Sequence, residues 1–293
     1  MDNLDELVNV LENSENAKAL KETAKEVGRL AFNSGNPCNR KGLVEADGLI
    51  GGLIRVMGKD GEGFREAREE AVGAIRSIAR YGSDEVKKGL FEYDGLVDCL
   101  LGRMREGGEV ERERAVWAIL LIAGGDNEVK KGLFAHEGLI DGLVGIAGKT
   151  GNGYVDAREC AVWAMNNIAD GDDEVKAGLF HFPGLMPRIE EILGDASLNW
   201  YANLTRTGAT TLTTTLLTWQ HGSFRATFET YTLLLKLCNM KVARAHPTSD
   251  SLSTLFRDSK DVASHILSFL ESKRSDLDHA KDRARNHGEI IWK

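Results

Sequence analysis

The side chains of this chain best suited to metal binding or nucleophilic chemistry are four cysteines and seven histidines. The cysteines are Cys38, Cys99, Cys160 and Cys238, and no two of them stand at Cys-x-x-Cys spacing. Zinc sites and disulfide frameworks are typically built from closely spaced cysteines, so buried thiols in a reducing compartment are the simpler expectation. The histidines are also dispersed, and no serine or cysteine stands in a nucleophile motif. The pattern predicts no metal, no other cofactor and no enzyme, with catalysis by dispersed residues as the alternative.

Two glycine-rich stretches invite comparison with ligand-binding loops. A phosphate-binding loop at Gly148-Lys149-Thr150 would require a glycine at position 143, where Leu143 stands, and a preceding strand. The stretch Asp60-Gly61-Glu62-Gly63 lacks the alternating oxygen ligands of a calcium loop. We therefore expect no nucleotide, no calcium ion and no small-molecule substrate.

A ten-residue motif recurs four times in the first two thirds of the chain. Its copies occupy residues 41–50, 88–97, 131–140 and 177–186, and their first glycines are separated by 47, 43 and 46 residues. A second block recurs in step with it, as Ala71-Val72-Gly73-Ala74, Ala115-Val116-Trp117-Ala118 and Ala161-Val162-Trp163-Ala164. Blocks that return in the same order at nearly constant spacing identify a repeat protein.

Each repeat is predicted to contain three helices. The first begins at an acidic lead such as Asp84-Glu85-Val86, because Asp and Glu favour a helix N-terminus. The second follows a glycine at position 48, 95, 138 or 184, which permits a sharp turn with positive φ. The third is the longest, and in one unit it runs from Ala157 to Ala169. One unit cannot bury its own apolar face, so neighbouring units are expected to stack.

The run from Ala161 to Ala169, with Trp163 and Asn167 in it and Gly171 after it, resembles the third helix of an armadillo repeat. The stretch Gly184-Leu185-Met186-Pro187 resembles the start of the second helix of that repeat. This resemblance implies an all-α chain in which residues 1–198 form a right-handed superhelix, an α-solenoid. Those residues would comprise a partial N-terminal unit, three full units and the start of a further unit. HEAT repeats are the alternative, although they lack the short first helix.

In armadillo proteins the third helices line a concave groove, where a Trp and an Asn four residues later hold an extended peptide. The resemblance implies that Trp163 and Asn167 form such a pair, while Trp117 has Leu121 at the Asn position and the unit before it has Ser77 there. Residues four apart share a helix face, and an amide both donates and accepts, which suits a peptide unit. Burial of the tryptophans between repeats, and a solvated or capping role for Asn167, are the alternatives.

One glutamate stands four residues before the Trp position in each unit, as Glu69, Glu113 and Glu159. If the third helices line a groove, these carboxylates form a row that attracts Lys or Arg from a partner. The alternative is that they only favour the first turn of their helices.

The repeat pattern fades after about residue 198. Eight threonines lie between Thr205 and Thr218, and Thr is a poor helix former. The third helix of the last unit is therefore expected to be distorted or missing. Residues 199–293 are predicted to be a divergent helical cap or tail with amphipathic helices over 224–244 and 259–270. Residues 261–270 faintly resemble the first helix of an F-box, which implies an adaptor in ubiquitin ligation as the alternative function.

Composition limits the class of partner. The formal net charge of −8 argues against nucleic acid, which requires a surplus of basic residues on one face. The N-terminus is acidic, unlike a signal peptide, and the longest apolar run, from Ala115 to Ala123, is far too short for a membrane span. We predict a cytoplasmic protein, with the nucleus as a second location. We predict that it is a non-catalytic scaffold that binds an extended, basic peptide or partner protein.

Overall fold

The computed structural model describes residues 4–33, 37–194 and 202–220, and every regular element among them is a helix. The chain divides into a compact unit from Met1 to Leu216 and a second unit from Leu217 to Lys293. The described residues belong almost entirely to the first unit. None of their helices combines the length and the apolar character needed to cross a membrane.

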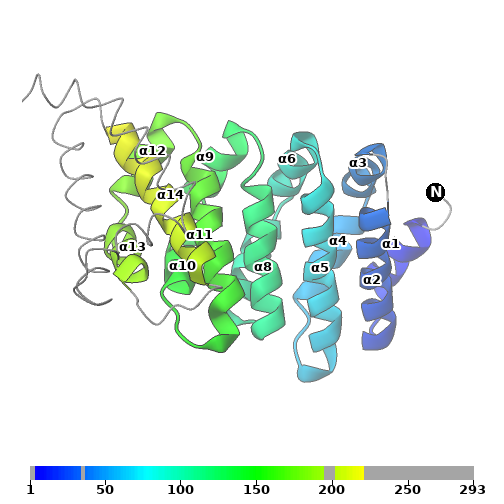
Figure 1. The fold of residues 1–293 in the computed structure, drawn as a ribbon. Coiled ribbons are helices and arrows are strands. Elements are labelled where there is room, and N and C mark those ends of the chain that lie inside the picture. Colours follow the sequence, from blue (N-terminus) through cyan, green and yellow to red (C-terminus); the bar gives the residue numbers. More distant parts are fainter. Residues whose placement is uncertain (1–3, 34–36, 195–201, 221–293) are drawn as a thin grey trace, which may run out of the picture. The chain divides into compact units, whose positions relative to one another are not determined.

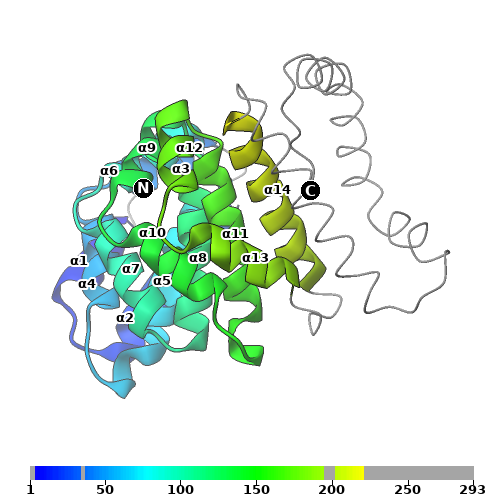
Figure 2. The same ribbon diagram turned by 90° about the vertical axis from the view of Figure 1, so that its left-hand side faces the viewer.

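The helices follow the predicted three-helix layout. A partial N-terminal unit is formed by α1 (Leu4–Asn13) and α2 (Ala17–Asn33). The units that follow consist of α3 (Pro37–Glu45), α4 (Leu49–Met57) and α5 (Arg65–Tyr81); α6 (Asp84–Glu92), α7 (Leu96–Glu106) and α8 (Glu109–Ile122); α9 (Asn127–Ala135), α10 (Leu139–Ala147) and α11 (Val155–Ala169); and α12 (Asp173–Phe180), α13 (Leu185–Gly194) and α14 (Ala202–Gln220). Short 3-10 turns, Glu62–Phe64 and Asn152–Tyr154, precede α5 and α11. The first helices α3, α6, α9 and α12 gather at one edge of the stack in both Figure 1 and Figure 2.

The turns into the second helices use the predicted glycines. Gly48, Gly95, Gly138 and Gly184 have φ angles of 78°, 73°, 73° and 83°, in the left-handed region that side chains with a Cβ atom avoid. Helices α6, α9 and α12 begin at the predicted acidic leads, at Asp84, Asn127 and Asp173, and the residue just before the lead caps two of them. Asp126 and Asp172 accept hydrogen bonds of 3.0 Å from the amides of Val129 and Val175, and so cap the starts of α9 and α12.

Neighbouring first helices pack through the other glycine of the repeated motif. A Cβ atom at Gly132 would overlap the ring of Phe91, and one at Gly178 would overlap the ring of Phe134. The aromatic residue of one unit therefore rests on the glycine of the next. This explains why a glycine recurs inside a helix, where its intrinsic propensity is poor.

The first helices are also joined by exposed ion pairs between the lysine before that glycine and an acid of the next unit. These pairs, which we call the ion-pair ladder, are Lys41–Glu85, Lys88–Glu128 and Lys131–Glu174. The ladder repeats at the same place in three successive unit boundaries. It follows one edge of the stack and lies apart from the third helices.

Third helices pack against one another through small side chains. Buried alanines recur on them, namely Ala71, Ala74, Ala115, Ala118, Ala161 and Ala164. Gly28 of α2 lies directly against Ala74 of α5. Short side chains at such contacts let helices approach closely, so each third helix buries one face and exposes the residues on the other.

The expectation of a distorted or missing helix in the threonine-rich segment is wrong, because α14 runs unbroken from Ala202 to Gln220. Ala209, Leu212 and Leu216 are buried at helical spacing, and this burial outweighs the low helix propensity of threonine. The hydroxyls of Thr211 and Thr213 donate to carbonyls four residues earlier, at 2.8 Å. The predicted helices over 224–244 and 259–270, and the F-box-like stretch 261–270, lie outside the described residues.

Candidate partner-binding surface

The third helices α2, α5, α8 and α11 lie side by side in chain order (Figure 1), and we call their shared outer face the third-helix surface. The residues predicted to bind a partner all lie on three of these helices: Glu69 and Ser77 on α5, Glu113 and Trp117 on α8, and Glu159, Trp163 and Asn167 on α11. All of them are half-buried. The helices thus bring the predicted set to one surface, but the surroundings of its members differ.

Asn167 caps the neighbouring helix. Helix α8 ends at Ile122, and the amide of Gly124, which would reach the carbonyl of Leu120 in a longer helix, donates to Leu121 instead. The Nδ2 atom of Asn167 donates to this carbonyl of Leu120 at 3.1 Å. One of the two N–H groups of the amide is therefore occupied, and its Oδ1 accepts no hydrogen bond from the described residues.

Ser77 also uses its donor within the chain. Its hydroxyl donates to the carbonyl of Gly73, one turn earlier in α5, at 2.9 Å. Only the lone pairs of the hydroxyl oxygen are left for a partner.

Trp163 lies between α11 and α14. A Cβ atom at Gly208 of α14 would stand 3.3 Å from the indole ring, so the absence of a side chain there makes room for the ring. The indole is half-buried and keeps part of its surface exposed.

Trp117 of α8 is covered by arginines of the preceding third helix, α5. The guanidinium carbon of Arg76 lies 5.1 Å from the centroid of the Trp117 ring, and that of Arg80 lies 5.9 Å from it. Arg80 is also 5.5 Å from the ring of Tyr81, over which Arg40 lies at 5.1 Å. We call these five residues the arginine–aromatic stack.

The sequence prediction missed the stack. Arg76 and Arg80 stand four residues apart on α5, one unit before Trp117, and this spacing is the signal that could have found them.

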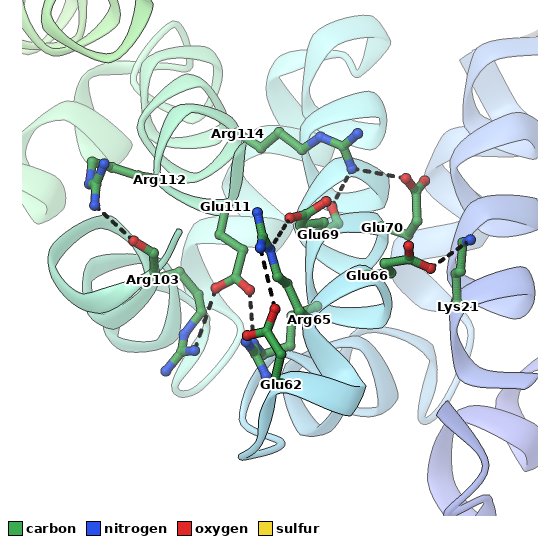
Figure 3. Close-up of polar contacts among 12 residues, drawn as sticks. Lys21, Glu62, Arg65, Glu66, Glu69, Glu70, Arg103, Glu111, Arg112 and Arg114 are labelled. Carbon is green, nitrogen blue, oxygen red and sulfur yellow. Dashed lines mark hydrogen bonds and ion pairs between the residues drawn. The ribbon is translucent and has the colours of Figure 1, made fainter. Parts of the chain in front are cut away.

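The glutamates predicted to form a row are not equivalent. Glu69 forms an ion pair with Arg65 of its own helix at 3.0 Å, as Figure 3 shows. Arg114 of α8 reaches back to α5 in the same view, where it pairs with Glu70 at 3.2 Å and donates to the carbonyl of Glu69. The acids at the start of α5 are thus largely neutralised by this chain's own arginines.

A buried ion pair also joins α5 to α8. Glu111 of α8 is 1% exposed, and it accepts from Nε of Arg68 at 2.9 Å, while Arg103 lies 3.6 Å away (Figure 3). Arg68 donates further to the carbonyls of Lys59 and Gly61. The charge of Glu111 is therefore held between two guanidinium groups.

The acids between α8 and α11 have no such partners. Glu109, Glu113, Asp156 and Glu159, which we call the open acidic cluster, form no ion pair with any described residue. Burial raises the pKa of Glu113 and of Glu159, and the charge of Asp156 raises the pKa of both further. Arg76 and Arg114 act in the opposite direction on Glu113, and the pKa of Glu113 is still raised. Across the described residues, no group of three or more His, Cys, Asp or Glu side chains is arranged to hold a metal ion.

The two described thiols are unsuited to nucleophilic chemistry. Burial raises the pKa of Cys99, and burial together with Glu159 raises the pKa of Cys160 to about 12. A thiol in such surroundings stays protonated and inert at neutral pH.

Neither a protein-family model nor a curated protein matches the chain by sequence. Solved structures match it by fold. A designed armadillo repeat protein in complex with the peptide (KR)4 superimposes with a TM-score of 0.68 at 24% identity, over 90% of this chain and 97% of that one. A computationally designed armadillo repeat protein for modular peptide recognition gives a TM-score of 0.68 at 23% identity, over 91% and 98%.

A natural protein also matches. The armadillo-repeats-only protein of Plasmodium falciparum superimposes with a TM-score of 0.52 at 17% identity, over 66% of this chain and 79% of that one. The chain therefore has the armadillo-repeat fold, an all-α solenoid, as the resemblance in its sequence implied.

Proposed function

We propose that this chain is a non-catalytic scaffold that binds an extended segment of a partner protein along the third-helix surface. The observation that carries the proposal is the open acidic cluster beside the half-buried Trp163. Two carboxylates of the cluster, Glu113 and Glu159, are half-buried, have raised pKa values and form no ion pair with a described residue, so a partner that supplies cations would relieve the cost of their charges.

The cluster favours a basic side chain at this place. The pKa values of Glu113 and Glu159 are raised because burial and Asp156 disfavour their charge. A Lys or Arg between them would supply the missing countercharge in a setting less screened than open solvent. A designed protein of the same fold was solved with the alternating basic peptide (KR)4, which supports a basic segment as the first probe.

Trp163 and Asn167 would orient such a segment. The indole offers a flat apolar face with a polarisable ring, which suits the stem and charge of an arginine or lysine. Oδ1 of Asn167 can accept from a peptide amide while Nδ2 remains bound to Leu120. Each neutral hydrogen bond of this kind contributes about 1 kcal/mol net, so affinity rests mainly on the charges.

Fluorescence anisotropy with a labelled (Lys-Arg)4 peptide tests the proposal. We expect binding that weakens as salt is added, and about a tenfold loss of affinity in the double variant Glu113→Gln/Glu159→Gln. Trp163→Ala should also weaken binding. Asn167→Ala is not a clean test, because it also removes the cap from the carbonyl of Leu120.

The matched control is Glu137→Gln/Asp141→Asn. Both residues are exposed and without an ion pair among the described residues, and they lie at the start of α10, apart from the third helices. The control changes the net charge by the same amount. If the control weakens peptide binding as much as Glu113→Gln/Glu159→Gln does, or if the parent does not bind the peptide, the proposal is wrong.

A further inference from the structure

The arginine–aromatic stack contains two arginines whose charge has no partner. Neither Arg76 nor Arg80 lies within ion-pair distance of an acid in the described part of the chain. The other arginines of α5 differ, since Arg65 pairs with Glu69 and Arg68 pairs with Glu111. A positive site is therefore left open on the third-helix surface.

The surroundings of Arg76 disfavour its charge. Burial lowers the pKa of Arg76, and Arg114 and Arg80 lower it further, whereas Glu113 acts in the opposite direction without forming an ion pair. An added carboxylate beside Arg76 and Arg80 would offset both the burial and the repulsion.

Stacking leaves the binding edge of each guanidinium available. The guanidinium carbons of Arg76 and Arg80 lie over the ring of Trp117, and the N–H groups of a guanidinium that stacks on a ring point outward in its own plane. A stacked arginine is held in place before binding, so less conformational entropy is lost when a carboxylate arrives. These arginines also occupy a face of Trp117 that a basic side chain of a partner would otherwise use.

An exposed aromatic residue adjoins the stack. Phe32 of α2 is 63% exposed, and its ring meets that of Tyr81 edge to face at 5.6 Å between centroids. Phe32 therefore adds one exposed apolar side chain to the edge of the stack.

We propose that Arg76 and Arg80, stacked on Trp117, bind a Glu or Asp side chain of the same extended partner segment whose basic residues contact the open acidic cluster. This inference rests on the proposed function and adds to it that the partner segment carries both signs of charge. The acidic residue would lie towards α5 and the basic residues towards α11. The chain would therefore prefer a segment with separated charges to a uniformly basic one.

Mixed-charge peptides test this inference. Each carries a Glu-Glu pair and a Lys-Arg-Lys-Arg block joined by a short Gly-Ser linker, in both orders, and each has a counterpart with Gln-Gln in place of Glu-Glu. In the parent chain we expect the better-bound Glu peptide to bind about tenfold more tightly than its Gln counterpart. In Arg76→Gln/Arg80→Gln the Glu peptide and its Gln counterpart should bind with equal affinity, whatever the absolute affinity of that variant for either.

The control variant is Lys18→Gln/Lys149→Gln. These lysines are exposed and form no ion pair among the described residues, so the control makes the same change in net charge elsewhere. It should preserve the preference for the Glu peptide.

Separate outcomes distinguish the two proposals. If the parent binds the Glu and Gln peptides with equal affinity, the role of the stack is refuted and the proposed function stands. If neither peptide binds, the proposed function itself fails. The comparison of peptides in the parent does not depend on how well the arginine variant folds.

Discussion

The α5–α8 and α8–α11 interfaces are formed by equivalent helices of successive units, yet their charged residues are paired differently. Between α5 and α8, Arg68 pairs with Glu111, and Arg114 pairs with Glu70 (Figure 3). Between α8 and α11 the acids have no basic partner among the described residues. One interface is closed by its own ion pairs, and the other is left acidic.

Two residue types account for this difference. With Trp117 aligned to Trp163, the position of Glu111 is taken by Ala157 and the position of Arg114 by Cys160. Arg112 aligns with Arg68 of the preceding unit, but position 157 holds no acid for it to pair with. Arg112 stacks on Tyr154 instead, with its guanidinium carbon 4.3 Å from the ring centroid. These two small residues remove the counterparts of the ion pairs that join α5 to α8. Glu113 and Glu159 lack a partner for another reason: the equivalent Glu69 pairs with Arg65, and the positions aligned with Arg65 hold Glu109 and Val155. A repeat protein can therefore leave acids unpaired at one interface by losing internal ion pairs, without any change of fold.

Removal of Glu111 should have the largest effect, because it breaks the closed interface. In Glu111→Ala the guanidinium groups of Arg68 and Arg103 lose a counterion that is 1% exposed. Breaking a buried pair from one side costs about 3 kcal/mol, and we expect the free energy of unfolding to fall by that amount. Urea denaturation followed by circular dichroism measures it.

The control is Glu85→Ala, which breaks the exposed pair with Lys41 and should cost less than about 1 kcal/mol. An equal loss in the two variants would mean that Glu111 is no more important than a surface acid. The contrast between the two interfaces would then have no energetic meaning.

The parts of this molecule that a sequence predicts well are those set by neighbouring residues. The turn glycines and the helix starts at Asp84 and Asp173 are determined within a few positions of the chain, so pattern and residue type are sufficient to find them. The helical state of the threonine-rich α14 was missed because it depends on burial of Leu212 and Leu216. Burial arises from tertiary packing, which local propensity does not contain.

For the candidate site, the sequence predicts which residues share a surface but not which contacts they make there. Its residues reach one surface because the helical period places them there. The bond from Asn167 to the carbonyl of Leu120 joins residues 47 positions apart, and the stacking of Arg80 on Trp117 also crosses between units. Such contacts depend on the offset between neighbouring helices, which no single repeat encodes.

The pH dependence of stability tests the α8–α11 interface, whose acids form no ion pair with the described residues. The pKa values of Glu113 and Glu159 are raised in the fold, so the folded protein holds protons there more firmly than the unfolded chain does. Their charges therefore disfavour folding above the raised pKa, and the penalty disappears as the pH falls to the ordinary value for glutamate. Glu113→Gln/Glu159→Gln should raise the unfolding midpoint relative to the parent at pH 7, by an amount that shrinks towards about pH 4.

Denaturant midpoints of parent and variant at several pH values measure this difference. Acids with lowered pKa values, such as Glu66 beside Lys21, act in the opposite direction, but they are common to both proteins and cancel. A variant less stable than the parent at neutral pH would show that the two carboxylates are satisfied within the fold. The charges of the open acidic cluster would then already be balanced within the folded chain.

The smallest expected change in stability belongs to the ion-pair ladder, which joins the same successive units through their first helices. Lys41→Ala removes the rung between α3 and α6, which joins the same two units as the α5–α8 interface. Lys88→Ala removes the rung between α6 and α9, which joins the same two units as the α8–α11 interface. All four partners of these rungs are at least 36% exposed, so each variant should lose less than about 1 kcal/mol, and less still in high salt. Denaturant midpoints of the two variants should agree with each other. A clear difference between them would mean that the asymmetry extends to the first helices, and that the contrast between closed and open interfaces is not confined to the third-helix surface.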